Sequence, residues 1–109
     1  MKMITAIVQN QDANALGKAF VAAKIQATRI ASKGGFLRAG NTTFLIGVPD
    51  DQVEQTLAII SETSKTRTQI MSPAWYTESV MESINTVPVE VQVGGATVFV
   101  QDVEQFHHF

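Results

Sequence analysis

Strand-like and helix-like patterns follow one another along this chain in an order that limits the folds available to it. Short or alternating apolar runs predict strands at residues 3–9, 25–31, 42–48 and 88–100. Apolar side chains at helical spacing predict helices at residues 13–23 and from residue 50 to about residue 64. The order β-α-β-β-α-β is that of the α+β ferredoxin-like, split βαβ arrangement. A weaker pattern at residues 66–73 predicts an additional strand or hairpin after the second helix.

The composition narrows the function classes open to a chain that, at 109 residues, is expected to form one domain. Hydrophobic content of 45% and charged content of 17% are typical of a globular protein. The formal net charge of -2 argues against a nucleic acid polymer as partner. The absence of cysteine excludes disulfides, thiolate catalysis and cysteine metal sites. The apolar N-terminal stretch is too short for a membrane span, so we expect a soluble cytoplasmic protein.

Two expectations concern how the first elements begin and pack. The Asn-Gln-Asp segment at residues 10–12 is expected to cap the first helix, and Asp50 is expected to cap the second. Phe20 is expected in the core, and the strand at residues 3–9 is expected at the centre of the sheet because it is apolar on both faces.

Glycines interrupt two of the predicted strands. The Phe-Leu-Ile run at residues 44–46 predicts burial on both faces, and Gly47 predicts an interruption by a bulge or by the close approach of another group. In the last strand the valines of residues 89–93 alternate with polar residues, and the apolar phase shifts by one residue after the Gly-Gly pair at 94–95. This shift predicts a β-bulge within one strand, which also places Phe99 among polar neighbours on one face.

The stretch at residues 31–47 is the best candidate for a binding site. Its Gly-Gly pair lets backbone N–H groups point at a partner. Phe36 and Leu37 supply an apolar floor, and Arg38 and Asn41 supply hydrogen-bond donors. This combination suits a small anionic ligand with a flat ring, such as a nucleotide. Its spacing matches neither the P-loop nor Gly-x-Gly-x-x-Gly, so these residues alone favour a simpler hairpin loop with Phe36 packed on its own sheet.

A polar row precedes this stretch on the strand at residues 25–31. Lys24, Gln26 and Thr28 share one face, because successive side chains of a strand point to opposite sides. The row either faces a ligand or forms a solvated sheet edge.

The segment at residues 74–87 is the least readable part of the chain. Its Trp75 and Tyr76 could stack on a base, but such a pair more often anchors a loop onto its own domain. Glu78 and Glu82 have helical spacing and are expected on a solvated face.

The chain ends in a Phe-His-His-Phe segment. Adjacent histidines in a strand point apart, so we expect a tail packed by Phe106 and Phe109 rather than a metal site at His107 and His108. With no base, nucleophile or metal constellation elsewhere, we do not expect an enzyme.

Three segments resemble one known family. They read MKMITAIVQ at residues 1–9, GGFLRAGNTTFL at residues 34–45 and PVEVQVGGATVFV at residues 88–100. All three are similar to the PII-like cyclic-di-AMP receptor family of the PstA/DarA type. The resemblance covers nearly the whole chain except residues 74–87.

The resemblance implies one PII-like domain over residues 1–109, with flexible loops at approximately 32–42 and 72–88. Such proteins are homotrimers of ferredoxin-like subunits that bind one cyclic-di-AMP in each cleft between neighbouring subunits. They are non-enzymatic receptors that need no cofactor or metal and act on a downstream protein partner, which the sequence does not name.

The resemblance also implies a set of ligand-binding residues: Gln26, Thr28, Gly35, Phe36, Leu37, Asn41, Gly47, Gly94, Phe99 and His108. Thr28 would donate its hydroxyl to a phosphate oxygen. Backbone groups of residues 35–37 would hold an adenine edge, with apolar contact from the side chains. Asn41 would read the base or order the loop, and Gly47 would leave room for close approach.

The chain departs from the family pattern in three places. Gln26 stands where the family usually has an arginine that contacts a phosphate. Replacing that charge-assisted hydrogen bond by a neutral one is expected to cost about 1–2 kcal/mol of binding free energy, or roughly tenfold in affinity. Lys24 and Lys33 are candidates to compensate. Residues 74–87 replace a glycine-rich segment, and His108 stands where a glutamine is frequent. These departures leave an alternative, a PII-like regulatory interaction protein with weakened, lost or altered nucleotide binding that acts through loop contacts.

Overall fold

The computed structural model describes residues 1–31, 40–71 and 89–109, and its main body is a four-stranded antiparallel sheet. The predictions made for residues 32–39 and 72–88 lie outside the described residues. The strands lie in the order β2-β3-β1-β6. Their bounds are β1 (Lys2–Gln9), β2 (Ala27–Ala31), β3 (Asn41–Val48) and β6 (Ala96–Asp102). Since β1 pairs with both β3 and β6, the predicted central position of the first strand is confirmed.

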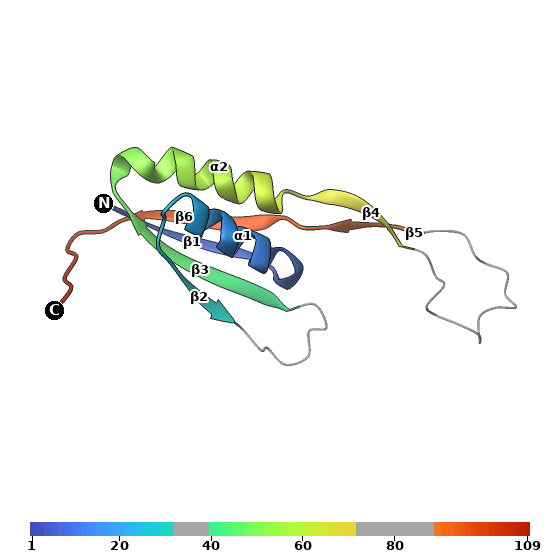
Figure 1. Ribbon diagram of the computed structural model, residues 1–109, viewed down its shortest axis with the longest axis horizontal. Coiled ribbons are helices and arrows are strands. Elements are labelled where there is room, and N and C mark those ends of the chain that lie inside the picture. The colour runs from blue at the N-terminus through green and yellow to red at the C-terminus, as the bar shows by residue number, and fades with distance from the viewer. Residues whose placement is uncertain (32–39, 72–88) are drawn as a thin grey trace, which may run out of the picture.

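Helices α1 (Asn10–Ala22) and α2 (Val53–Ser64) cover one face of this sheet (Figure 1). The short 3-10 turn η1 (Asp50–Gln52) leads into α2. Neither α1 nor α2 is long and apolar enough to cross a membrane. Helices packed on an antiparallel sheet make a compact α+β arrangement, which is consistent with a ferredoxin-like fold.

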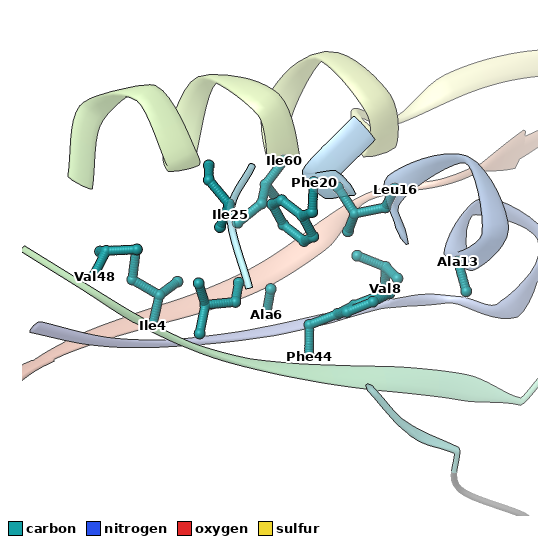
Figure 2. Packing of buried hydrophobic residues seen from close by; sticks show 11 residues of the cluster. Ile4, Ala6, Val8, Ala13, Leu16, Phe20, Ile25, Phe44, Val48 and Ile60 are labelled. Carbon is teal, nitrogen blue, oxygen red and sulfur yellow. The ribbon is translucent and has the colours of Figure 1, made fainter. Parts of the chain in front are cut away.

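The core lies between the helices and the sheet (Figure 2). Leu16 and Phe20 of α1 and Ile60 of α2 are buried there. They pack over alternate residues of β1 and β3, namely Ile4, Ala6, Val8, Phe44, Ile46 and Val48. The rings of Phe20 and Phe44 meet edge to face with their centroids 5.6 Å apart. The predicted place of Phe20 in the core is therefore confirmed.

The opposite face of the sheet carries the remaining residues of the same strands. In the register, Thr5 of β1 lies opposite Leu45 of β3 and Phe99 of β6. No described helix covers this face, where Leu45 is half-buried and Phe99 is 53% exposed. The predicted burial of Phe44-Leu45-Ile46 on both faces is therefore wrong, because both helices pack on the same side of the strand.

A two-stranded arm extends from the main body (Figure 1). It consists of β4 (Arg67–Met71) paired antiparallel with β5 (Val89–Val93), and we call this pair the arm. Gly94 and Gly95 follow with φ values of 87° and 99°, a left-handed backbone that favours glycine. The predicted β-bulge is wrong, because these glycines separate two strands that belong to different sheets.

The residues predicted to cap the helices have other partners. α1 begins at Asn10 without any side-chain cap, because the Asn10 side chain accepts a hydrogen bond from Thr42 instead. η1 begins after Pro49, also without a side-chain cap, and the Asp50 carboxylate lies 2.9 Å from the N-terminal ammonium. The hydrogen bond from that ammonium lowers the pKa of Asp50. Both capping predictions are therefore wrong, since tertiary partners compete with the local backbone for these side chains.

Gly94→Ala is expected to lower the free energy of unfolding by at least about 1–2 kcal/mol, because alanine resists the left-handed backbone. Its Cβ would also lie only 2.6 Å from the carbonyl oxygen of Lys65. Urea denaturation at one fixed protein concentration measures this change.

The matched control is Gly17→Ala in α1, where, apart from its chain neighbours and the helix's own nearby backbone, no described atom lies within 4 Å of an added Cβ. This change is expected to raise the free energy of unfolding by about 0.5–1 kcal/mol, as alanine in place of glycine does inside a helix. Equal effects of the two substitutions would contradict the role given to Gly94.

Candidate functional site

A hollow at the beginning of β2 brings together four of the residues predicted for the site. Lys24, Gln26, Thr28 and Gly47 line it, and its volume is about 900 Å³. The other lining residues come from the N-terminus, the end of α1, strands β2 and β3 and the C-terminal segment: Met1, Val21, Ile25, Ala27, Leu45 and Phe106. The hollow therefore lies where both ends of the chain meet the edge strand of the sheet.

The turn between α1 and β2 exposes part of the predicted polar row. The Ile25 N–H donates to the Phe20 carbonyl oxygen at 2.9 Å, and the Ile25 side chain is buried in the core. Lys24 takes a φ of 59°, a left-handed conformation common just past a helix end and usually supplied by glycine. β2 begins at Ala27, so Gln26, which was predicted in the strand at residues 25–31, lies before the strand and next to the turn that holds Lys24.

The two faces of β2 serve different parts of the molecule. Thr28 lies opposite Leu45, on the face without helices, and is exposed. Arg29 lies opposite Phe44, on the helix face, and donates to the Asn14 Oδ1 at 2.9 Å. Strand alternation therefore places the Thr28 hydroxyl with Gln26 at the hollow and directs the Arg29 charge away from it.

Gly47 does not interrupt its strand as predicted. It lies within β3 and is in register with Met3 of β1. A Cβ at Gly47 would meet the Met1 Cε at 3.2 Å. The close approach at this glycine thus comes from the chain's own N-terminal side chain.

The other described site residues do not converge on the hollow within one copy of the chain. Asn41 is the first residue of β3, about 20 Å along the strand from Gly47. Gly94 lies at the base of the arm. Phe99 lies on β6, and because β3 and β1 lie between β6 and β2, these two edge strands are about 14 Å apart. Outside the described residues lie Lys33, Gly35, Phe36 and Leu37.

The C-terminal segment is not packed by its phenylalanines as predicted. Phe106 is 65% exposed, and Phe109 is fully exposed. The His107 ring stacks on Phe109 with the centroids 5.6 Å apart, while Phe106 lines the hollow. The core between the helices and the sheet closes without the tail, which leaves His108 exposed.

The charge of the hollow suits an anion. Lys24 lines it, and no described carboxylate does. The ion pairs within residues 1–31, 40–71 and 89–109 join Asp50, Asp102 and Asp12 to the N-terminus, Lys2 and Arg67, and do not involve Lys24. In the same ranges no three acidic or histidine side chains gather as a metal site would require.

The remaining six lining residues of the hollow were not among the predicted site residues: Met1, Val21, Ile25, Ala27, Leu45 and Phe106. Met1 and Phe106 lie near opposite ends of the chain, so only the folded structure brings them together. Val21 is a large apolar residue outside the buried stripe of α1 and is 76% exposed.

Comparisons with known proteins identify a family that this chain matches. A family model described as cyclic-di-AMP receptor matches residues 1–109. A crystal structure of a protein from Pediococcus pentosaceus ATCC 25745, described as functionally unknown, is similar with a TM-score of 0.79 and 44% sequence identity. The similarity covers 99% of this chain and 96% of that one.

Lys24→Gly is expected to raise the free energy of unfolding by about 1 kcal/mol, because glycine adopts the left-handed φ without strain. Lys18→Gly in the interior of α1 removes the same charge and is expected to lower it by about 1 kcal/mol. Urea denaturation of both variants at the same protein concentration makes the comparison. A loss of stability in both would contradict the strain assigned to Lys24.

Proposed function

This chain belongs to the cyclic-di-AMP receptor family, and from that membership we propose that it is a non-enzymatic receptor that binds cyclic-di-AMP and signals to a protein partner. The family match over residues 1–109 carries this proposal. The anion-suited hollow at the beginning of β2 supports it, because cyclic-di-AMP carries two phosphates between two flat bases.

The active form in this proposal is a homotrimer with one ligand in each cleft between subunits. Two observations support a site shared between copies. The implied ligand residues Asn41, Phe99 and Thr28 lie far apart on one copy's sheet. The sheet face without helices also exposes apolar side chains, with Ile30 45% and Phe99 53% exposed, so a second copy would bury them.

The ligand-binding roles follow from the chemistry of the residues. The exposed Thr28 hydroxyl donates to a phosphate oxygen. Asn41 offers an amide to a base edge at the start of β3. Residues 35–37, outside the described part of the chain, supply backbone donors and apolar contact to adenine. His108 and Gly94 contribute at the rim of the cleft, and no covalent step is required of any residue.

Gln26 lacks the positive charge of the arginine that the family usually has at this position, and Lys24 is its proposed replacement. Lys24 and Gln26 line the same hollow, two residues apart on one exposed turn. An ammonium there supplies the charge that the Gln26 amide lacks, although as a single point charge rather than a bidentate fork. Lys33 is the second candidate and lies outside the described residues.

Gln26 also favours a second candidate function. A hollow with weaker phosphate contacts fits a PII-like interaction protein whose nucleotide binding is reduced or altered and whose loops contact a partner. The two candidates differ in whether cyclic-di-AMP binds at cellular concentrations.

Calorimetric titration with cyclic-di-AMP tests the receptor. We expect saturable binding near one ligand per subunit, with little or no heat from cyclic-di-GMP or ATP. Thr28→Val is expected to weaken binding by about 10- to 100-fold, the effect of losing a hydrogen bond to a charged group. Thr63→Val makes the same change on α2, which covers the opposite face of the sheet, so this matched control is expected to bind as the wild type does.

Absence of heat and of any thermal shift with all three nucleotides would overturn the receptor proposal. The interaction protein without a nucleotide would then take its place.

Gln26→Arg tests the role of the missing charge. Restoring the guanidinium is expected to tighten cyclic-di-AMP binding by roughly tenfold, since charge-assisted hydrogen bonds are about twice as strong as neutral ones. Gln55→Arg on the exposed surface of α2 makes the same change in net charge away from the hollow. Equal tightening by both variants would assign the effect to net charge rather than to residue 26.

A further inference from the structure

The junction between β1 and α1 fixes the start of β3. Gln9, the last residue of β1, is the register partner of Asn41. The backbone N–H of Asn10 donates to the Gly40 carbonyl oxygen at 3.1 Å, and the Thr42 hydroxyl donates to the Asn10 Oδ1 at 2.5 Å. Three consecutive residues around Asn41 are therefore held by this junction.

The same junction also holds the base of the arm. The Gly94 N–H, just past β5, donates to the Gln9 Oε1 at 2.8 Å. Arg67, the first residue of β4, donates through Nη2 to the Asp12 Oδ1 at 2.6 Å and through Nη1 to the Asp12 Oδ2 at 3.3 Å. Asp12 is only 4% exposed, so removing this partner would leave a buried carboxylate without its ion pair. Both strands of the arm are thus tied to the junction.

These two attachments meet at one end of the sheet. Figure 1 shows the start of β3, the start of α1 and the base of the arm together at that end. Gln9 joins them most directly, since its backbone pairs with Asn41 and its side chain binds Gly94. A restraint on Asn41 therefore acts on the residue that positions the arm.

The base of the arm combines a left-handed glycine backbone with a buried hydroxyl that lacks a partner among the described residues. Gly94 and Gly95 give the backbone there unusual freedom, and the Gly95 N–H is bonded to the Ser64 carbonyl oxygen. The Ser64 hydroxyl is buried and has no hydrogen-bond partner among the described residues. The Arg67 side chain is 43% exposed, so it can exchange Asp12 for water. Release of the arm would allow water to hydrate the Ser64 hydroxyl and the Arg67 guanidinium.

We propose that Gln9, Asp12 and Arg67 form a latch that couples ligand binding at Asn41 to the position of the arm. This inference rests on the proposed function, because it takes Asn41 as a ligand-binding residue. Ligand held at Asn41 restrains the start of β3 and keeps Gln9 in the geometry that accepts the Gly94 N–H. Cyclic-di-AMP therefore stabilises the attached arm, and the arm reports occupancy to a partner.

Coupling of this kind is reciprocal. If ligand stabilises the latch by a given factor, an intact latch strengthens ligand binding by the same factor. Asp12 and Arg67 do not line the hollow, so their substitution tests the coupling without removing a ligand contact. Typical coupling between two sites corresponds to a change of about fivefold or more in affinity.

Hydrogen exchange of the full chain, with and without saturating cyclic-di-AMP, measures the arm. In the wild type, the amides of β4 are expected to exchange about fivefold or more slowly when ligand is bound. Asp12→Asn removes the carboxylate charge that pairs with Arg67, Gln9→Met removes the acceptor of the Gly94 N–H, and both changes keep the side-chain size. In both variants the ligand effect on β4 is expected to fall below about twofold, with binding weakened by about fivefold or more.

Glu54→Gln, which removes a carboxylate from the first turn of α2, is the matched control and is expected to respond as the wild type does. Gln9→Met keeps the test decisive if Asp12→Asn fails to fold, because it removes the acceptor of the Gly94 N–H and leaves the Asp12–Arg67 pair intact. Two results would overturn the latch and leave the receptor proposal intact. One is that ligand does not change the exchange rate of β4 in the wild type. The other is that the latch variants show the same ligand effect and the same affinity as the wild type. Absence of cyclic-di-AMP binding to the wild type in calorimetry would overturn both proposals.

Discussion

The one-sided packing of α1 and α2 on the sheet is the constraint on which the rest of this structure depends. Alternate residues of β1 and β3 are buried under Phe20, Leu16 and Ile60, and the Phe20–Phe44 ring contact lies at the centre of this layer. Because strand side chains alternate, burying one set leaves the other set on the open face. The amphipathic helices therefore decide that Thr28, Leu45 and Phe99 are available to partners outside the chain.

The implied ligand residues are spread widely over the sheet of one copy. Thr28 lies on the edge strand β2, Phe99 lies on β6 at the other edge, and Asn41 lies at the far end of β3. A site assembled between copies uses both edges and the apolar face at once, which fits the homotrimer we propose. In that proposal, the charge at residue 24 and its absence at residue 26 would set the strength of phosphate binding.

The arm depends on the glycine pair that joins it to the four-stranded sheet. The Gly94-Gly95 pair takes the chain out of one sheet and into another, and its left-handed backbone permits the change of direction. The polar side chains of residues 9–12, free of any capping role, bind Gly94, Arg67 and Thr42 instead. A signal received near β3 thus has a physical connection to an element that a partner could read.

The sequence by itself determined the order of the elements, the central place of β1, the burial of Phe20 and the division of each strand into two faces. These properties follow from the spacing of apolar residues along the chain, which is a local property of the sequence. It also located a change of apolar phase at residues 94–95, but only the tertiary structure decided that the change is a transfer between sheets. The Asp12–Arg67 pair, the Met1 contact at Gly47 and the exposed tail likewise depended on which distant segments the completed sheet brought together, and no local pattern encodes those distances.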